Sequence, residues 1–333
     1  MIVVDAHLDL AYNAVEWDRD LRLSAHDTRK LEDGMPEKGR ATGTVGFPDM
    51  RRGHVAVAFG TVFSRVAWPW SGVSGFRTGE NGYAHARAQL AYYQQAERTG
   101  GVRLIQNLPT LERHLAEWSE TSEAAPPLGI VVTMEGADPI LAPDDLALWW
   151  QAGLRMLGLA HYGVSAYAHG TGSPGGLLPT ARPLLAEMAR LGITLDVSHL
   201  AEQAFYESLD SFGGRVIASH SNCRALVPGD RQLSDDMIRR LVERGGVIGS
   251  VMDAWMLKSG WLRGVSTNED LSVEDFVAHI DHVCQIAGDA RHAGIGSDLD
   301  GGYGTEQCPR DLDTIADLQK VPECLRARGY SEA

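Results

Sequence analysis

Short apolar runs alternate with amphipathic stretches along most of the chain. Eight of the runs have the length and composition of buried strands: residues 2–9, 54–63, 129–135, 154–161, 193–199, 215–220, 246–252 and 293–298. Helical periodicity lies between most of them, at residues 84–99, 143–152, 180–191, 200–211, 234–244 and 272–287. Glycine follows several of these stretches, as is typical of a helix C-terminus, at Gly100, Gly153, Gly192 and Gly245. Apolar strands that alternate with helices indicate parallel strands with covered faces.

The number of these strand–helix units favours a (β/α)8 barrel of the TIM type. A further short run at residues 102–106 is a candidate ninth strand, so strand number alone leaves an open sheet as the alternative. With 333 residues and 44% hydrophobic residues, the chain suits a single barrel domain over residues 1–333. We interpret two stretches that break the alternation, at about residues 16–53 and 64–82, as long loop insertions. The tryptophans of the second insertion, Trp68 and Trp70, are candidates for part of a specificity pocket.

Composition and charge narrow the partners and the compartment. A net charge of −14 argues against nucleic acid or an anionic membrane as a partner. The chain has no apolar run of about 18 residues, as a membrane-spanning helix needs, and starts without the basic and apolar regions of a secretory signal. Its cysteines form no CxxC pair and are expected to be thiols, at Cys223, Cys284, Cys308 and Cys324. We therefore expect a cytoplasmic protein.

Polar residues stand at the C-terminal ends of different apolar runs. These residues are His7, Asp9, Glu135, His161, His199, His220 and Asp298. In a parallel barrel, the C-terminal ends of the strands meet on one face, where active sites lie. One such residue would be an ordinary structural group, but seven that titrate or bind metals indicate a functional site.

The spacing of the first acids and histidines suits metal binding. His7 and Asp9 are two residues apart on a strand, so their side chains point to the same side. A hydrogen-bonded surface pair is the alternative for these two. Glu135 ends a buried run, where a carboxylate is costly unless it is paired or bound to metal. Its two oxygens can bridge two cations about 3.5–4 Å apart, and a salt-bridged barrel residue is the alternative.

The later candidates extend this pattern. His199 and His220 each follow an apolar run that ends in serine, and neutral imidazole is a common zinc ligand. Either histidine alone would more often be structural, but the repeat on consecutive strands favours ligands. Asp298 follows the last run and can bind metal and accept a proton from water. Asp300 competes for that role, although Gly301 and Gly302 suggest that Asp300 begins a turn.

In their order along the chain, these motifs resemble the membrane (renal-type) dipeptidase family of zinc peptidases, peptidase family M19. That family is a branch of the metal-dependent, amidohydrolase-type barrels. The resemblance runs from His7-Leu8-Asp9 through Glu135-Gly136 and the two Ser-His pairs to the Arg-x-Leu-Ser-Asp segment at Arg231–Asp235. It ends with Gly-Ile-Gly-Ser-Asp-Leu-Asp-Gly at residues 294–301, the most specific motif.

The resemblance implies a role for each of these residues and two Zn²⁺ per chain, with other divalent ions left open. One metal would be bound by His7, Asp9, Glu135 and Asp298, and the other by Glu135, His199 and His220. His161 would stabilise the tetrahedral intermediate, and Arg231 would bind the C-terminal carboxylate of the substrate. Tyr162 begins a segment that differs from the corresponding loop of mammalian members, so we expect it to shape the substrate pocket.

The expected function is hydrolysis of the amide bond of small dipeptides, L-Xaa-D-Xaa dipeptides among them. Two cations lower the pKa of a shared water and so supply hydroxide, while Asp298 accepts the proton of that water. A related barrel hydrolase that acts on N-acyl amino acids or lactams is the first alternative. The second is a catalytically silent barrel that binds a partner, which six intact candidate ligands disfavour. Members of the family are often dimers, and a homodimer is left open.

Overall fold

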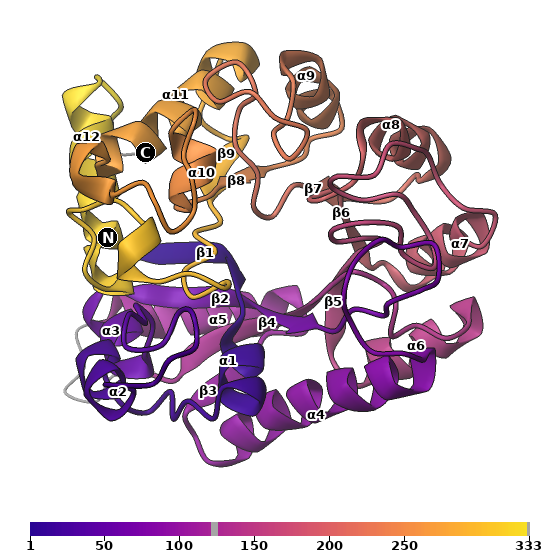
Figure 1. The fold of residues 1–333 in the computed structure, drawn as a ribbon, viewed down its shortest axis with the longest axis horizontal. Helices are drawn as coiled ribbons and strands as arrows, with labels where there is room; N and C mark the ends of the chain where they lie inside the picture. Colours follow the sequence, from indigo (N-terminus) through magenta and orange to yellow (C-terminus); the bar gives the residue numbers. More distant parts are fainter. Residues whose placement is uncertain (121–125, 332–333) are drawn as a thin grey trace.

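Parallel strands of the chain form a nearly closed barrel (Figure 1). The computed structural model describes residues 1–120 and 126–331. The strands are β1 (Val3–Leu8), β2 (Val55–Phe63), β3 (Val102–Leu104), β4 (Leu128–Glu135), β5 (Leu154–Gly158), β6 (Thr194–Asp196), β7 (Val216–Ile217), β8 (Ile248–Ser250) and β9 (Ala293–Ile295). Their hydrogen-bonded order is β7-β6-β5-β4-β2-β1-β9-β8, and a parallel bridge between Ala218 and Ile248 links its two ends. The predicted TIM-type (β/α)8 barrel is confirmed.

The candidate ninth run forms a strand outside the barrel order. β3 pairs in parallel with the first half of β4, from Val102 opposite Leu128 to Leu104 opposite Ile130. The second half of β4 pairs with β5, starting at Val132. The same edge of β4 therefore serves two neighbours in succession, and the extra strand leaves the barrel intact.

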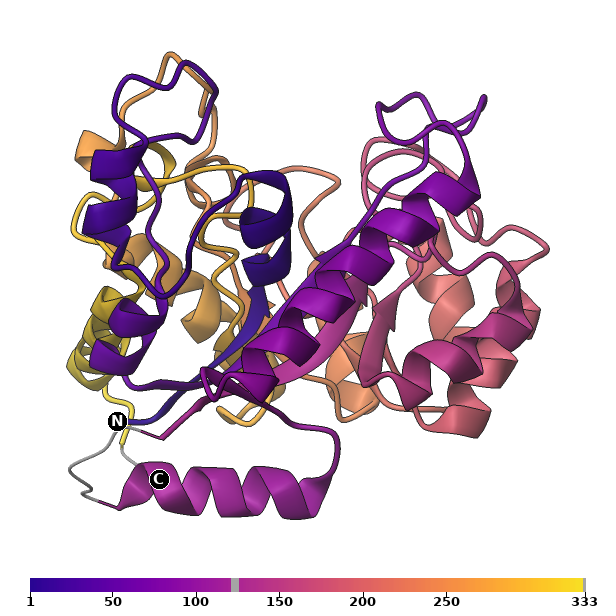
Figure 2. The same cartoon turned by 90° about the horizontal axis from the view of Figure 1, so that it is seen from below.

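Helices surround the strands on the outside (Figure 1). They are α1 (Leu10–Glu16), α2 (Ala25–Leu31), α3 (Phe47–Arg52), α4 (Gly79–Arg98), α5 (Leu108–Ser119), α6 (Leu146–Gln151), α7 (Ala181–Leu191), α8 (Glu202–Ser211), α9 (Asp235–Glu243), α10 (Ala254–Leu257), α11 (Val273–Ala287) and α12 (Lys320–Ala327). Gly192 ends α7 in a left-handed conformation with φ 73°, as its position after the periodic stretch predicts. In Figure 2, α5 lies at the end of the barrel where the N-terminus lies, and the long loops rise at the opposite end.

Most of the strands end earlier than the apolar runs that predict them, and beyond the ends of β6, β7 and β9 buried aspartates bind the backbone. Asp196 closes β6, and its Oδ1 accepts hydrogen bonds from the backbone N–H groups of Ser198 and Ser219, each at 3.0 Å. On the opposite side of the barrel, Asp5 Oδ1 accepts the backbone N–H of Ser297, at 2.9 Å, just after β9. The chain therefore leaves the ladder at these points without exposing unpaired donors.

The first insertion, residues 16–53, is held to the barrel end by a buried ion-pair cluster. Asp300 Oδ1 accepts the backbone N–H and the hydroxyl of Thr44, both at 2.7 Å. Arg19 Nη1 lies 3.3 Å from Asp300 Oδ2, and its Nε donates to Glu32 Oε1 at 2.7 Å. The cluster connects the first insertion, through Arg19 and Thr44, to the segment that follows β9. Asp300 is thus bound within the fold, which removes it as a competitor of Asp298.

Replacing Arg19 by methionine should therefore destabilise the protein strongly. The change would leave the buried carboxylate of Asp300 without its cation and Glu32 with Arg40 alone, at a cost of roughly 3–5 kcal/mol in the free energy of unfolding. Urea denaturation followed by circular dichroism measures it. Arg22→Met is the matched control, because Arg22 pairs with Asp20 while its side chain is 82% exposed, and it should change stability little. Equal stabilities of the two variants would contradict the assigned role of the cluster.

Two smaller expectations concern thiols and membranes. The four cysteines are free, in agreement with their scattered positions. Within residues 1–120 and 126–331, none of the helices combines the length and the apolar character that crossing a bilayer requires.

Candidate metal centre

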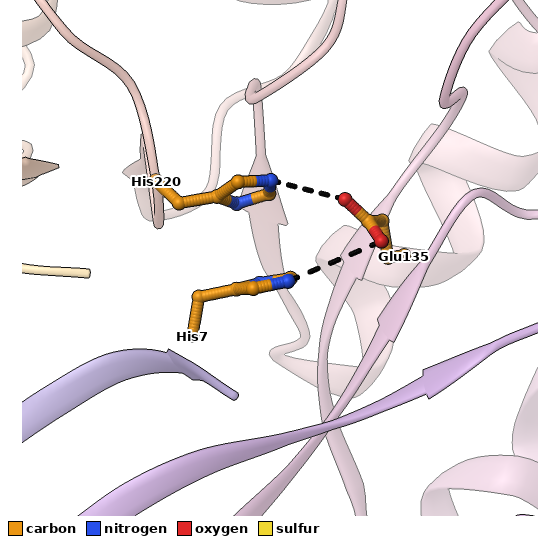
Figure 3. A group of neighbouring side chains, drawn as sticks. All are labelled: His7, Glu135 and His220. Atoms are coloured by element: carbon orange, nitrogen blue, oxygen red, sulfur yellow. Dashed lines mark ion pairs between the residues drawn. The ribbon is translucent and has the colours of Figure 1, made fainter. Parts of the chain in front are cut away.

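The seven polar residues predicted at strand ends come together at the C-terminal end of the barrel. Glu135, the last residue of β4, lies at their centre. Its Oε1 is 3.1 Å from His199 Nε2 and 3.0 Å from His220 Nε2, and these two nitrogens are 3.1 Å apart. Its other oxygen, Oε2, lies 4.0 Å from His7 Nε2. Figure 3 shows the stacked rings of His7 and His220 directing nitrogen atoms toward this carboxylate.

The hydrogen bonds behind two of the rings determine which nitrogen carries the proton. The Ser219 hydroxyl donates to Asp196 Oδ2 at 2.5 Å, so its oxygen accepts from His220 Nδ1 at 2.8 Å. In the same way, the Thr171 hydroxyl donates to the carbonyl of His199 and accepts from His199 Nδ1 at 3.1 Å. With Nδ1 protonated, a neutral imidazole has a bare lone pair on Nε2.

The lone pairs of His199 Nε2 and His220 Nε2 and the carboxylate oxygen Glu135 Oε1 therefore face one another at about 3 Å. These three electron-rich atoms repel one another unless a cation lies between them. Two further atoms support this interpretation: His7 Nε2 and Asp9 Oδ1 are buried without a hydrogen-bond partner among the described residues. His7 Nε2 is also 3.7 Å from Asp298 Oδ1. The donor set of imidazole nitrogens and carboxylate oxygens fits divalent transition ions such as zinc.

Three overlapping groups have ligand atoms close enough to share an ion. They are His7, Glu135 and His220; Glu135, His161 and His199; and His7, Asp9 and Asp298. Glu135 belongs to two of the groups, and His7 also belongs to two. This overlap matches a centre in which neighbouring cations share ligands, and it brings all six sequence-predicted metal ligands within one cluster.

The pKa shifts describe a buried site in which the histidines stay neutral and the carboxylates resist ionisation. Burial lowers the pKa of His7 to about 3, and it holds the pKa values of His199 and His220 well below the ordinary range. Burial raises the pKa of Asp9 to about 7. Burial, reinforced by the Asp9 carboxylate, raises the pKa of Glu135 well above its usual value. Bound cations would relieve this repulsion and keep the carboxylates ionised.

Two of the candidate ligands adopt a strained backbone conformation. His199 has φ 65° and Asp298 has φ 59°, in the left-handed region that non-glycine residues rarely occupy. Both residues follow the last hydrogen-bonded residues of short strands. The turn that each makes aims its side chain into the barrel mouth, and strain of this kind is common at functional sites.

A cavity of about 300 Å³ opens over the carboxylates and histidines. His161, Tyr162 and Arg231, the predicted substrate-binding residues, all line it. Arg231 is 4% exposed and donates to the carbonyl of His220 at 2.7 Å and to Ser221 Oγ at 3.0 Å. The remaining lining residues are Asp9, Tyr12, Trp17, Phe63, Arg65, Glu135, His199, Asp253, Trp255, Met256, Arg263, Asp298, Gly301 and Gly302.

The expectation that Trp68 and Trp70 line a specificity pocket is wrong for this cavity. Their rings stack on each other with centroids 5.5 Å apart, and Trp68 Nε1 donates to Asp138 Oδ1 at 2.9 Å. Asp138 also accepts the backbone N–H of Val66, so the tryptophans fasten the second insertion to the end of β4. The insertion instead contributes Arg65 to the cavity.

Sequence reasoning missed the carboxylates that orient the candidate ligands. Asp196 reaches His220 through Ser219, and Asp5 accepts the backbone N–H of His7 at 3.2 Å. A signal was present, because each aspartate precedes a candidate ligand histidine by two or three residues in the sequence, Asp5 before His7 and Asp196 before His199. Arg65, Asp253 and Arg263 gave no such signal, since they lie on loops whose paths the sequence pattern does not predict.

Comparison with known proteins identifies relatives that match the whole chain. A model of the family described as membrane dipeptidase (peptidase family M19) matches residues 1–333. The solved structure of dipeptidase AC, a metallopeptidase of family M19, superposes with a TM-score of 0.81 at 25% identity, covering 100% of this chain and 93% of that one. A metallopeptidase from Rhodobacter sphaeroides, solved with a phosphinate mimic of the dipeptide L-Ala-D-Ala, gives a TM-score of 0.78 at 25% identity and covers 100% and 94% of the two chains.

Two sequence relatives extend the comparison. A protein of Klebsiella pneumoniae, named only for its position in the pqqA 5′ region, is 29% identical over 73% of this chain and 88% of its own length. Dipeptidase tcpJ of Claviceps purpurea is 33% identical over 56% of this chain, and the match spans 42% of that relative. The whole-chain family match, together with the clustered donor atoms, shows that this chain belongs to the membrane dipeptidase family of metallopeptidases, peptidase family M19.

Proposed function

We propose that the chain is a dinuclear zinc dipeptidase that hydrolyses the amide bond of small dipeptides. The observation that carries the proposal is the arrangement around Glu135, whose Oε1 faces the lone pairs of His199 Nε2 and His220 Nε2 at about 3 Å. In this proposal, His7, Asp9, Glu135 and Asp298 would hold one cation. Glu135, His199 and His220 would hold the second, with Glu135 contributing to both sites.

Bound zinc would polarise the scissile carbonyl and lower the pKa of the attacking water. The residues of the chain supply the rest. Asp298, which lines the cavity, accepts the proton of the attacking water and passes it to the leaving amine. His161 offers an N–H to the oxyanion that develops on the carbonyl oxygen. Burial of these groups in the barrel mouth strengthens each interaction, because the local dielectric is low.

In this proposal, Arg231 binds the free C-terminal carboxylate of the substrate. Its guanidinium is held by the carbonyl of His220 and by Ser221 Oγ, and no acidic side chain of the described residues forms an ion pair with it. A buried arginine that keeps donors free is suited to a carboxylate that arrives with the substrate. The ligand of the Rhodobacter sphaeroides relative mimics L-Ala-D-Ala, which supports including dipeptides with a C-terminal D-residue among the substrates.

A substrate panel tests the proposal. The zinc-reconstituted chain should hydrolyse L-Ala-L-Ala or L-Ala-D-Ala, and kcat/KM should fall roughly 10–100-fold for the corresponding dipeptide amide, which lacks the charged partner of Arg231. The Arg231→Lys variant should narrow the difference between acid and amide. Equal turnover of acid and amide would remove Arg231 from carboxylate binding.

The panel also includes N-acetyl amino acids and a lactam. Hydrolysis of these compounds without hydrolysis of any dipeptide would keep the metal centre and reject the dipeptidase proposal. A chain that binds zinc and acts on none of these substrates would favour the silent barrel.

A further inference from the structure

His161 carries its proton on the opposite nitrogen from His199 and His220. Arg65 Nη1 lies 3.3 Å from His161 Nδ1 in hydrogen-bond geometry. A guanidinium has donors and no acceptor, so Nδ1 must be the accepting nitrogen. The proton of the neutral ring is then on Nε2, which is the nitrogen that faces Glu135 Oε1, at 3.9 Å.

We propose that Arg65 is a positioning residue that fixes His161 as the Nε2–H tautomer and so makes it a hydrogen-bond donor rather than a metal ligand. The proposal rests on the dipeptidase function described above, in which His161 stabilises the oxyanion. His161 Nε2 belongs by distance to a potential metal-binding group with Glu135 and His199. A protonated Nε2 has no lone pair for a cation. The hydrogen bond from Arg65 therefore keeps His161 a hydrogen-bond donor and prevents it from acting as a metal ligand.

The surroundings fix the ring as well as its tautomer. Phe63 contacts the His161 ring edge-on at a centroid distance of 4.7 Å, and Tyr162 does so at 4.8 Å. These contacts define the orientation of the imidazole but do not distinguish its two neutral tautomers. Apart from Arg65, no hydrogen-bond partner of either ring nitrogen is found within the described residues, so the tautomer depends on this one contact.

Arg65 is itself held in place by the second insertion. Its Nε donates to the carbonyl of Ser74 at 2.6 Å, and its Nη2 lies 3.3 Å from Ser74 Oγ. The backbone carbonyl of Arg65 accepts from Phe76 N at 2.8 Å, which closes residues 65–76 into a loop. The side chain is half-buried, and within the described part of the chain it has no ion pair with a carboxylate. The loop therefore directs the Arg65 guanidinium at His161 and provides no carboxylate that would neutralise its charge.

The Asp138 side chain connects the loop of residues 65–76 to the segment that follows His161. Asp138 Oδ2 accepts from Val66 N at 2.9 Å, and its Oδ1 accepts from Ala166 N at 2.9 Å. One carboxylate thus holds the residue after Arg65 and a residue five positions after His161. The Asp138 side chain thus holds the backbone near Arg65 and the backbone after His161 together, as a positioning contact requires.

The tautomer is directly measurable by nuclear magnetic resonance. Long-range ¹H–¹⁵N spectra of the zinc-loaded chain labelled with ¹⁵N-histidine distinguish a protonated Nδ1 from a protonated Nε2, and His161→Asn identifies the signals of His161. We expect a protonated Nε2 for His161 and a protonated Nδ1 for His199 and His220. In Arg65→Met, the His161 signals should shift to the other tautomer or to a mixture. A protonated Nδ1 in the native chain, or an unchanged tautomer in Arg65→Met, would overturn the proposal.

Kinetics give the second readout. For a dipeptide with uncharged side chains such as L-Ala-L-Ala, Arg65→Met should lower kcat by roughly 10–100-fold while KM and zinc content stay within about threefold, because the oxyanion donor is lost but the binding groups remain. Arg65→Lys, which keeps a donor, should recover part of the rate. Arg77→Met, an exposed change in the same segment, should behave like the native chain.

The remaining outcomes separate this proposal from the function on which it rests. A loss confined to dipeptides with acidic side chains would show that Arg65 binds substrate and would overturn the positioning role. If the native chain hydrolyses no dipeptide, the proposed function fails, yet the NMR comparison still decides between the tautomers because it requires no turnover.

Discussion

Replacing Glu135 by glutamine is expected to abolish hydrolysis and to reduce the zinc content of the protein. Glutamine keeps the size of the side chain but removes the charge and one of the two acceptor oxygens that the proposed bridge needs. Glu135 Oε1 lies 3.0–3.1 Å from His199 Nε2 and His220 Nε2. In the variant, a neutral amide takes the place of the carboxylate, and an amide binds zinc weakly. We expect kcat/KM to fall roughly a thousandfold or more, since cations supply several kcal/mol of transition-state stabilisation.

Zinc analysis and steady-state kinetics measure this effect together. Glu117→Gln serves as the control, because Glu117 lies on α5, pairs with Arg103 of β3 and is outside the cavity. The neutral amide also avoids the burial of a charge and the crowding with Asp9 that together raise the pKa of Glu135, so the metal-free variant should be at least as stable as the metal-free native chain. A Glu135→Gln variant with full zinc content and a native rate would remove Glu135 from the centre.

The Asp298→Asn variant should lose the chemical step while keeping most of its binding. Asparagine lacks the basicity to take a proton from water, and loss of a general base lowers kcat by roughly 100–10,000-fold. Asparagine tolerates the left-handed backbone that Asp298 adopts at φ 59°, so the fold should survive. One amide oxygen remains to bind a cation, and we expect the KM for dipeptides to change far less than kcat.

The neighbouring Asp300 offers a matched comparison for this variant. Asp300 has a similar backbone conformation, with φ 62°, but its carboxylate binds Thr44 and Arg19 and does not line the cavity. Asp300→Asn should lower the free energy of unfolding and leave kcat close to the native value. If both variants lowered kcat equally, the change at Asp298 would reflect distortion of the loop rather than loss of a base.

The sequence pattern predicted the barrel and the central cluster because both depend on the periodicity of apolar strands. In a parallel barrel, a residue at the C-terminal end of a strand has a defined place, so Glu135, His199 and His220 could be brought together without coordinates. Strand lengths were less predictable. The runs that lead to His199 and His220 predict strands up to the histidines, yet Asp196 accepts hydrogen bonds from the backbone N–H groups of Ser198 and Ser219, and both ladders end before these residues.

Residues on loops could not be placed in the same way. Arg65 reaches His161 only because the second insertion returns at Ser74 and Phe76 and is fastened by Asp138. These contacts depend on loop conformations that have no repeating pattern. For the same reason, the position of Trp68 and Trp70 in a long loop suggested a substrate pocket, whereas Trp68 anchors the loop by its hydrogen bond to Asp138.

The most direct test of the dinuclear centre is a zinc titration of the metal-free native chain, with bound zinc and the rate of L-Ala-D-Ala hydrolysis measured on the same samples. The arrangement of His7, Asp9, Glu135, His199, His220 and Asp298 predicts that the rate rises until about two equivalents are bound and then levels off. A full rate with no zinc or with a single equivalent, or saturation at about two equivalents without hydrolysis of any dipeptide, would contradict the account.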